Sequence, residues 1–303
     1  MPDNPASENP KPVTPVRTRV SARSRPPSPG TATGRPAPAS RPDNGGRRPG
    51  RERYGPGVED EDGYFGEEIA ATYDESSAAM FRPEAVDPAV DLLAGLARDG
   101  RALEFASGTG RIALPLARRG IPVHGIDMSR AMTARLRAKP GSDAVDVTIG
   151  DFATTRVPGT FAVAYLVFNT INNLVTQDAQ VACFHNAAAH LGPGGCFVVE
   201  VGVPDLRRLP PGQDAVPFEI GPTRWAFDTY DVTTQAMSSH YVKIVDGRAE
   251  HWSVPFRYVW PAELDLMARL AGLRLRDRWE TWTGEPFTAE SRSHVSVWEK
   301  PLD

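Results

Sequence analysis

Residues 103–113 read Leu-Glu-Phe-Ala-Ser-Gly-Thr-Gly-Arg-Ile-Ala and are more informative than any other stretch of the chain. Apolar residues run into a turn of small residues, after which Ile112, Leu114 and Leu116 follow at helical spacing. The pattern predicts a buried strand, a tight glycine turn and the start of a helix, the arrangement that holds an adenine-containing cofactor. Gly108 and Gly110 can adopt backbone angles closed to other residues, so a ligand can approach the main chain there.

On both sides of this turn, short apolar runs alternate with helical patterns. Five strands are predicted, over 101–105, 123–126, 145–149, 161–168 and 196–201. After a helix over 261–271, strands over 273–279 and 294–298 are expected to close the sheet as an antiparallel pair. The sequence therefore predicts an α/β fold with a doubly wound, seven-stranded, Rossmann-like sheet.

Between residues 203 and 260 the apolar pattern changes to a period of two. Strands are expected over four segments, 216–220, 224–230, 235–245 and 249–259. Asp246-Gly247 is a strong signal for a hairpin turn between the last two. We expect an antiparallel insertion after the fifth strand, on the substrate side of the sheet.

Residues 1–62 are rich in Pro, Arg and Ser and hold almost no Leu, Ile or Phe. Such a segment cannot offset its own ordering entropy, so we predict a disordered tail and a single domain over 63–303. Residues 1–53 contain eleven Lys or Arg against four Asp or Glu, and the net charge of the whole chain is −4. A basic tail therefore precedes an acidic body.

Composition also bears on partners and location. No apolar stretch approaches the length needed to cross a bilayer, so no membrane partner is expected. Cys183 and Cys196 lack metal-like spacing to histidines, so we expect no metal and interpret both as reduced core thiols of a cytoplasmic protein. The acidic body argues against nucleic acid as a partner. The oligomeric state is left open, and a homodimer is compatible with the sequence.

Three carboxylates lie near the ends of the first three predicted strands. Glu104 lies within the strand before the glycine turn, Asp127 ends the second strand, and Asp151 with Phe152 follows the third. The carboxyl ends of parallel strands form the ligand crevice of an open sheet, so these residues should meet there. The glycine run also fits the dinucleotide pattern, which leaves a nicotinamide-dependent oxidoreductase as an alternative. That alternative leaves Glu104 and residues 150–152 unexplained.

Together these residues resemble the class I S-adenosylmethionine-dependent methyltransferases over residues 64–300, including Leu-Gly-Pro-Gly-Gly at 191–195. One departure from the family pattern is Ala-Ser at 106–107, a small-for-small exchange. The resemblance implies S-adenosyl-L-methionine as the cofactor, with the ribose held at Asp127 and the adenine at Asp151 and Phe152. It implies that Glu104 orients the amino acid end, and that Tyr73-Asp74 covers the cofactor. The implied cofactor-binding residues are Tyr73, Glu104, Ala106, Gly108, Gly110, Asp127, Met128, Asp151, Phe152 and Phe168.

Candidates for binding the methyl acceptor come from two segments. Residues 168–174 follow the fourth strand and are rich in amides, and amides can orient a polar substrate without adding charge. We take Asn169, Asn172 and Asn173 from this loop, and Tyr241 from the insertion, as substrate-binding residues. The loop lacks the Asn/Asp-Pro-Pro-Tyr motif that marks methylation of nucleic acid bases or protein glutamine.

Two histidines are candidates for a catalytic base. His240 and His251 flank the Asp246-Gly247 turn at nearly matched distances, so they could lie opposite each other in the hairpin. Either one would then remove a proton from the acceptor.

The antiparallel segment after strand five resembles that of small-molecule methyltransferases acting on amino sugars and glycine-like amines. The expected function is methyl transfer from S-adenosyl-L-methionine to a nitrogen or oxygen of a small molecule, in a setting such as secondary metabolism. An RNA methyltransferase that grips phosphates with the basic tail remains an alternative.

Overall fold

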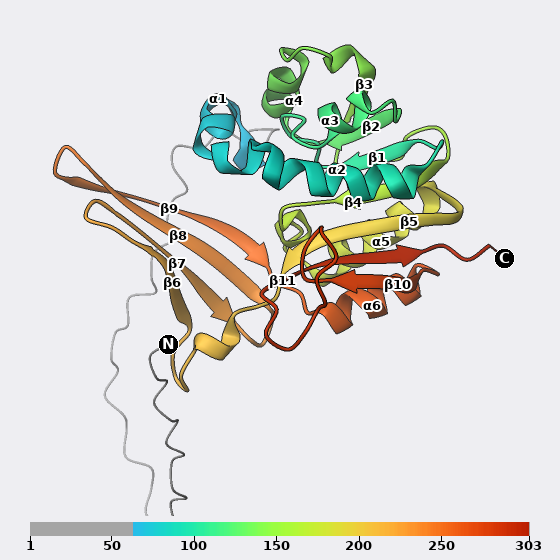
Figure 1. Cartoon of the computed structure of the whole chain (residues 1–303). Coiled ribbons are helices and arrows are strands. Elements are labelled where there is room, and N and C mark those ends of the chain that lie inside the picture. Colours follow the sequence, from blue (N-terminus) through green and yellow to red (C-terminus); the bar gives the residue numbers. More distant parts are fainter. Residues whose placement is uncertain (1–62, 303) are drawn as a thin grey trace, which may run out of the picture. The chain divides into compact units, whose positions relative to one another are not determined.

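The computed structural model describes residues 63–302, and the predicted tail over 1–62 lies outside them. The division into a tail and one domain over 63–303 stays a prediction. The central sheet contains seven strands, which are β1 (Ala102–Phe105), β2 (Val123–Asp127), β3 (Val145–Ile149), β4 (Phe161–Leu166), β5 (Leu191–Gly202), β10 (Arg274–Trp279) and β11 (Ser293–Glu299). Their order is β10-β11-β5-β4-β1-β2-β3, with β11 antiparallel to both of its neighbours (Figure 1). The predicted doubly wound α/β fold is confirmed.

Helices cover both faces of this sheet, as its buried strands β1, β2 and β4 require. The helices are α1 (Glu67–Ser76), α2 (Pro83–Ala97), α3 (Ala113–Arg118), α4 (Arg130–Arg137), α5 (Gln177–His190) and α6 (Pro261–Leu270). One core cluster joins the sheet to α5 and α6 through residues such as Phe184 and Leu264. A second cluster joins the opposite face to α2 and α3 through residues such as Leu93 and Leu116.

Two predicted strand ends differ from the structure. The strand predicted over 161–168 ends at Leu166 because Phe168 and Asn169 take left-handed φ angles of 60° and 61°. The fifth strand begins at Leu191, whereas the sequence predicts its start at residue 196. Residues 192–195 join the strand because Gly194 N, at a left-handed φ of 74°, donates to Lys300 O at 2.8 Å and ties this segment to the end of the chain.

The antiparallel insertion forms a separate four-stranded sheet (Figure 1). It contains β6 (Ala215–Ile220), β7 (Arg224–Asp231), β8 (Ala236–Val245) and β9 (Arg248–Arg257). The β8–β9 hairpin turns at Asp246 and Gly247, with φ angles of 50° and 75°, as the sequence predicts. Directly paired residues share a face. We call inner face the side that carries three such rows, Ala226–Tyr241–Trp252, Asp228–Ser239–Val254 and Tyr230–Met237–Phe256.

The segment before α2 forms an N-terminal arm. It consists of η1 (Gly63–Phe65), α1 and η2 (Ala78–Phe81). Ala70 and Tyr73 of α1 pack with Ala131 and Met132 of α4, so the arm lies beside the carboxyl end of β2. Among residues 63–302, no helix combines the length and apolar character needed to span a membrane. The predicted cytoplasmic location stays a prediction.

Buried His294 gives the fold a specific sensitivity to acid. The ring of His294 on β11 is fully buried and contacts Ser296 Oγ at 2.8 Å. Burial, with Arg278 nearby, lowers the pKa of His294 to about 3. Below about pH 6.5 the His294 side chain is protonated in the unfolded chain but stays neutral in the folded protein. The free energy of unfolding therefore decreases as the pH falls.

We expect this histidine alone to lower the free energy of unfolding by about 2 kcal/mol between about pH 6.5 and pH 5. The measurement is urea denaturation across this range, compared between the wild type and His294→Gln, whose pH dependence should be flatter. Exposed His185 provides the control, because His185→Gln should keep the wild-type slope. Identical slopes in all three proteins would show that His294 is not the group responsible.

Candidate active site

Two adjoining cavities lie at the carboxyl ends of the central strands. The first, which we call the strand-end pocket, has a volume of about 320 Å³ and reaches from the glycine turn to residues 151–152 and 173–175. The second, the inner-face pocket, has a volume of about 480 Å³ and lies against the inner face of the antiparallel sheet. Both are lined by Tyr64, Phe65, Tyr73, Thr170, Asn173 and Val254. The two cavities therefore share a wall.

Asp127 fixes the shape of the strand-end pocket. Its Oδ2 accepts a hydrogen bond from Gly108 N at 2.6 Å, and its Oδ1 accepts one from Ser129 N at 2.8 Å. The carboxylate thus joins the glycine turn after β1 to the start of α4, where the Ser129 side chain caps the helix by accepting from Met132 N. Ala106 and Gly108, with φ angles of 53° and 55°, also line the pocket.

Gly110 does not line the strand-end pocket. Its φ of 84° suits glycine, and a Cβ at this position would lie 2.9 Å from Leu114 Cγ and 3.0 Å from Leu136 Cγ. The absent side chain thus lets α3 and α4 pack closely. The structure supports a packing role for Gly110, in place of the predicted cofactor contact.

Glu104 lies beneath the pocket and is not part of its lining. It is only 2% exposed, and its Oε2 has no hydrogen-bond partner in the described part of the chain. Burial raises the pKa of Glu104 to about 8, although nearby Arg111 opposes the shift. A carboxyl buried here without a full set of partners is costly, and its predicted role toward the cofactor stays a prediction.

The other end of the strand-end pocket is apolar apart from one carboxylate. Asp151 follows β3, and its Oδ1 accepts from Ala153 N at 2.8 Å. Phe152 stacks on Phe105 with ring centroids 5.9 Å apart. Met128, 47% exposed, lies on the same pocket wall. The arrangement suits a flat ring with an amino group at its edge.

The N-terminal arm is fastened to the glycine turn by hydrogen bonds. Thr109 Oγ1 donates to Asp74 Oδ1 at 2.6 Å, and Lys139 forms an ion pair with Asp74 while donating to Thr109 O at 2.8 Å. Ser129 Oγ donates to Phe65 O at 2.6 Å. These contacts place Tyr73 where both pockets meet.

The amide-rich loop supplies one wall of the inner-face pocket. Asn169, Asn172 and Asn173 all line it. Asn169 Oδ1 accepts from Gly202 N at 2.6 Å, which joins the ends of β4 and β5. Asn172 is 8% exposed and its Oδ1 has no partner among residues 63–302, so an acceptor is free to meet a hydrogen-bond donor there.

Phe168 belongs to the inner-face pocket, not to the strand-end pocket where the sequence predicts it. Its left-handed backbone directs the chain away from β4, and its N donates to Glu200 Oε2 at 2.9 Å. The Arg111 guanidinium lies 5.2 Å from the centre of its ring.

The antiparallel sheet contributes a half-buried carboxylate to the inner-face pocket. Asp228 Oδ1 accepts from Ser239 Oγ at 2.6 Å, and its Oδ2 accepts a long hydrogen bond of 3.5 Å from Tyr230. Burial raises the pKa of Asp228, although these hydrogen bonds and nearby His240 oppose the shift. Sequence reasoning missed Asp228, but its position in a period-two strand with pocket-lining Tyr230 is a signal that points to it.

Among the described residues, the charged side chains that line the two pockets are all acidic. Asp205 and Asp228 line the inner-face pocket, and Asp127 and Asp151 line the strand-end pocket. Within residues 63–302, neither lining includes a Lys, Arg or His. Arg208, outside the lining, forms an ion pair with Asp205 at 3.1 Å, and the other lining carboxylates favour ligands that carry positive charge over phosphates.

Similarity to known proteins agrees with this geometry. Residues 102–195 match a family described as "Methyltransferase domain". The structure of the CcbJ methyltransferase from Streptomyces caelestis is 35% identical, with a TM-score of 0.69 over 78% of this chain and 98% of that chain. The protein belongs to the class I S-adenosylmethionine-dependent methyltransferases.

Two other relatives show how far the likeness extends. The methyltransferase is 29% identical to the cypemycin N-terminal methyltransferase of a Streptomyces species, over 67% of this chain and 84% of that protein. It shares its fold with CalS10 from Micromonospora echinaspora, an amino pentose methyltransferase involved in calicheamicin biosynthesis. That structure has 22% identity and a TM-score of 0.57 over 76% of this chain and 96% of that chain.

The strand-end pocket fits the cofactor of this family, S-adenosyl-L-methionine. Its sulfonium and ammonium groups suit a lining that holds two carboxylates and, among the described residues, no basic side chain, and the apolar wall suits its adenine. A dinucleotide would bring a pyrophosphate into the same acidic surroundings. The residues present therefore disagree with the nicotinamide alternative.

The two predicted base candidates are placed on the wrong side of the antiparallel sheet. His240 pairs with Phe227 and Ser253, and none of the three belongs to the inner face. Its Nδ1 contacts Ser253 Oγ at 2.7 Å, and its ring lies parallel to that of His251 with centroids 5.8 Å apart. The histidines do adjoin each other, as predicted, but neither lines a pocket. The geometry gives no support to their role as the base, which stays a prediction.

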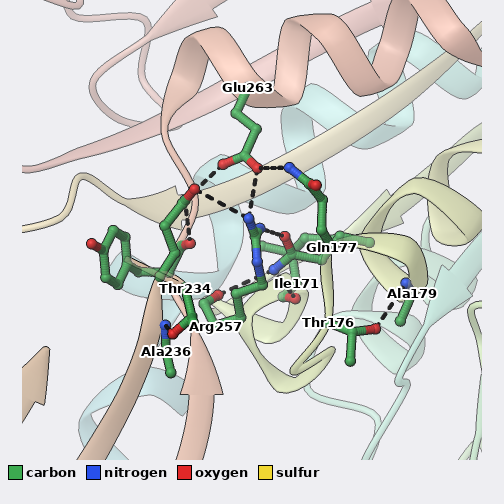
Figure 2. Close-up of polar contacts among 11 residues, drawn as sticks. Ile171, Thr176, Gln177, Ala179, Thr234, Ala236, Arg257 and Glu263 are labelled. Atoms are coloured by element: carbon green, nitrogen blue, oxygen red, sulfur yellow. Dashed lines mark hydrogen bonds and ion pairs between the residues drawn. The ribbon is translucent and has the colours of Figure 1, made fainter. Parts of the chain in front are cut away.

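A buried arginine joins the antiparallel sheet to the body of the methyltransferase (Figure 2). Arg257, at the end of β9, is 4% exposed and forms an ion pair with Glu263 of α6 at 2.7 Å. It also donates to Gln180 of α5 and, at 3.2 Å, to Gln235 beside β8. Burial raises the pKa of Glu263, but hydrogen bonds from Gln235, Arg257 and Gln177 outweigh it, so the pKa lies below its ordinary value.

This network holds two walls of the inner-face pocket at a fixed separation. Gln180 Nε2 donates to Ile171 O at 3.2 Å and to Arg257 O at 3.1 Å. Ile171 lies within η4 (Thr170–Asn173), whose neighbouring asparagines line the pocket, while Phe256 and Tyr258 flank Arg257 and line the opposite wall. Figure 2 shows Arg257, Glu263 and Ile171 converging from three segments.

We expect Arg257→Met to lower the free energy of unfolding by about 3 kcal/mol, because buried Gln180 would lose a donor and Glu263 would lose its cation, keeping the neutral donors Gln177 and Gln235. Arg269→Met, at an exposed site on α6, is the control and should cost less than about 0.5 kcal/mol. Urea denaturation at neutral pH measures both. Equal losses in the two variants would contradict the role assigned to the network.

Proposed function

We propose that this methyltransferase transfers a methyl group to an amine nitrogen of a small molecule. The observation that carries the proposal is the inner-face pocket, which contains Asp205 and Asp228 and, among the described residues, no basic side chain. An amine is protonated at neutral pH and is drawn to such a pocket, whereas a phenolate, carboxylate or phosphate is repelled. The 29% identical relative is named for methylating an N-terminus, which is also an amine.

We propose that the strand-end pocket holds S-adenosyl-L-methionine. Asp127 would accept the ribose hydroxyls, and Asp151 would accept from the adenine amino group. Phe152 and Met128 would line the adenine, and Ala106 and Gly108 would pass close to the methionine portion. When bound, the cofactor supplies an electrophilic methyl group on a sulfonium.

Residues of the chain then perform the remaining tasks. Tyr73 lies at the shared wall and excludes water from the place where the two pockets meet. Asn172 and Asn173 orient the N–H groups of the acceptor through their amide oxygens. Asp228 holds the ammonium form of the acceptor and accepts its proton, for which the raised pKa makes it better suited than an exposed aspartate. The neutral amine is the nucleophile.

The RNA alternative finds no support in this pocket. A polynucleotide acceptor would bring phosphates past Asp205 and Asp228, and the described pocket lining offers no cation to meet them.

Asp127→Ala tests the cofactor site. We expect it to weaken binding of S-adenosylhomocysteine by more than about 100-fold, because hydrogen bonds to a charged group are lost, and to lower thermal stability because Gly108 N loses its partner. Calorimetric titration measures the affinity, and circular dichroism at the same temperature verifies that the variant is folded. Asp143→Ala, at an exposed site, should match the wild type. Unchanged affinity in folded Asp127→Ala would refute the placement of the cofactor.

Asp228→Asn tests the acceptor site. With labelled S-adenosylmethionine and a panel of amines, phenols, carboxylates and sugars, we expect the wild type to methylate amines. Loss of the negative charge should lower kcat/KM by about 100-fold for those amines and leave the affinity for S-adenosylhomocysteine unchanged. Exposed Asp178→Asn is the matched control. Wild-type rates in Asp228→Asn, or transfer to phenols alone, would overturn the proposed amine specificity.

A further inference from the structure

Four aromatic side chains form a surface at the outer end of the inner-face pocket. We call this surface the aromatic shelf, and it consists of Tyr64, Phe218, Tyr241 and Trp252. Three of the four also line the pocket, so the shelf is continuous with it. Figure 1 shows that the sheet carrying most of the shelf projects beyond the central sheet.

The rings of the shelf are held in fixed orientations. Tyr241 and Trp252 are neighbours across β8 and β9, with centroids 5.3 Å apart and planes inclined by 13°. Phe218 meets the edge of Tyr241 with centroids 5.9 Å apart. Tyr64 comes from the N-terminal arm, where burial raises the pKa of its hydroxyl and nearby Trp252 opposes the shift.

The shelf is ordered and yet open to solvent. Tyr64, Phe218 and Trp252 are 42%, 49% and 36% exposed. A contiguous group of exposed aromatic rings is unfavourable in water and marks a binding surface. Aromatic rings also offer a large apolar area at a low cost in side-chain entropy, because few torsions must be fixed.

We propose that the aromatic shelf binds a flat apolar ring that forms the far end of the acceptor, while the amine of the same acceptor lies in the inner-face pocket. The inference rests on the proposed function, because it takes the occupant of that pocket to be an amine. It adds the chemical class of the rest of the molecule. Along the sheet, the row with Tyr241 and Trp252 lies next to the row with Asp228 and Ser239, so one molecule can present a ring to the shelf and an amine to Asp228.

The test uses dansylcadaverine, an alkyl amine joined to a naphthalene ring, with the full-length protein loaded with S-adenosylhomocysteine. Emission of the dansyl group rises when the ring leaves water, so titration gives a Kd. We expect Trp252→Ala and Phe218→Ala each to raise this Kd by about tenfold through loss of ring contact. We expect the wild type to transfer a methyl group from S-adenosylmethionine to the same probe, detected by mass spectrometry.

Trp225 offers a matched control on the same sheet. It lies on β7, is 37% exposed, and pairs with Val242 on the face opposite the shelf. Trp225→Ala removes an equally exposed tryptophan without touching the shelf, so the Kd of dansylcadaverine should stay within about twofold of the wild-type value.

Two probe analogues separate the shelf from the amine site. Cadaverine has the amine without the ring, and its Kd, measured by competition, should rise in Asp228→Asn and stay unchanged in Trp252→Ala. N-acetyl dansylcadaverine has the ring without the charge. If it binds the wild type as tightly as dansylcadaverine does, the proposed amine function fails while the shelf stands.

Three results would overturn the inference itself. In the first, Trp252→Ala and Phe218→Ala bind dansylcadaverine with the same Kd as the wild type, while Asp228→Asn binds it more weakly. The second is a wild-type Kd above about 1 mM. In the third, Trp252→Ala dissociates a dimer in analytical ultracentrifugation and leaves the Kd of the probe unchanged. That outcome would assign the shelf to contact between two copies of the chain.

Discussion

The Asp127 carboxylate is the interaction on which the arrangement of both pockets depends. Its two oxygens accept from Gly108 N and Ser129 N, so one side chain at the end of β2 fixes the turn after β1 and the start of α4. Ser129 in turn holds Phe65 of the N-terminal arm, and Thr109 of the same turn holds Asp74. The arm places Tyr73 at the shared wall, so the boundary between donor and acceptor is set from this carboxylate outward.

The wall that the antiparallel sheet gives to the inner-face pocket is held in place by Arg257. The antiparallel sheet leaves the body after β5 and returns at Arg257, and that arginine is buried among groups from α5, α6 and the start of β8. A buried ion pair is weak support for stability, because taking both charges out of water costs nearly as much as their attraction returns. Its geometry is nevertheless demanding, since Arg257 must meet three partners at once. Such a network specifies one position of the sheet against the amide-rich loop.

Local features explain why much of the fold was predictable. Ser129 caps a helix through its own side chain, and Asp246-Gly247 adopts the turn that these two residue types favour, so both could be placed from neighbouring residues alone. The apolar runs of β1 to β4 reveal buried parallel strands for the same reason. Asp127, Asp151 and Phe152 could be placed at one pocket because parallel strands bring their carboxyl ends to one edge. The surroundings of Gly110 and His240 could not be predicted, because tertiary packing sets them. Whether a glycine faces a ligand or Leu136 depends on how α4 packs, and which face of a hairpin meets the body depends on how the whole sheet docks.

The shared acidity of the two pockets has a consequence for the energetics of turnover. When an amine accepts the methyl group, the sulfonium becomes a neutral thioether and the acceptor nitrogen becomes cationic, so one positive charge crosses the wall at Tyr73. Carboxylates lie on both sides of that wall, Asp127 and Asp151 behind it and Asp205 and Asp228 in front. In the proposed mechanism Asp228 has by then taken up the proton of the acceptor, and Asp205 is paired with Arg208 at 3.1 Å, so the charge leaves a pocket with two carboxylates for one whose carboxylates are already balanced. The lining therefore does not drive the transfer, and the exothermic chemistry of the sulfonium sets the direction of the reaction.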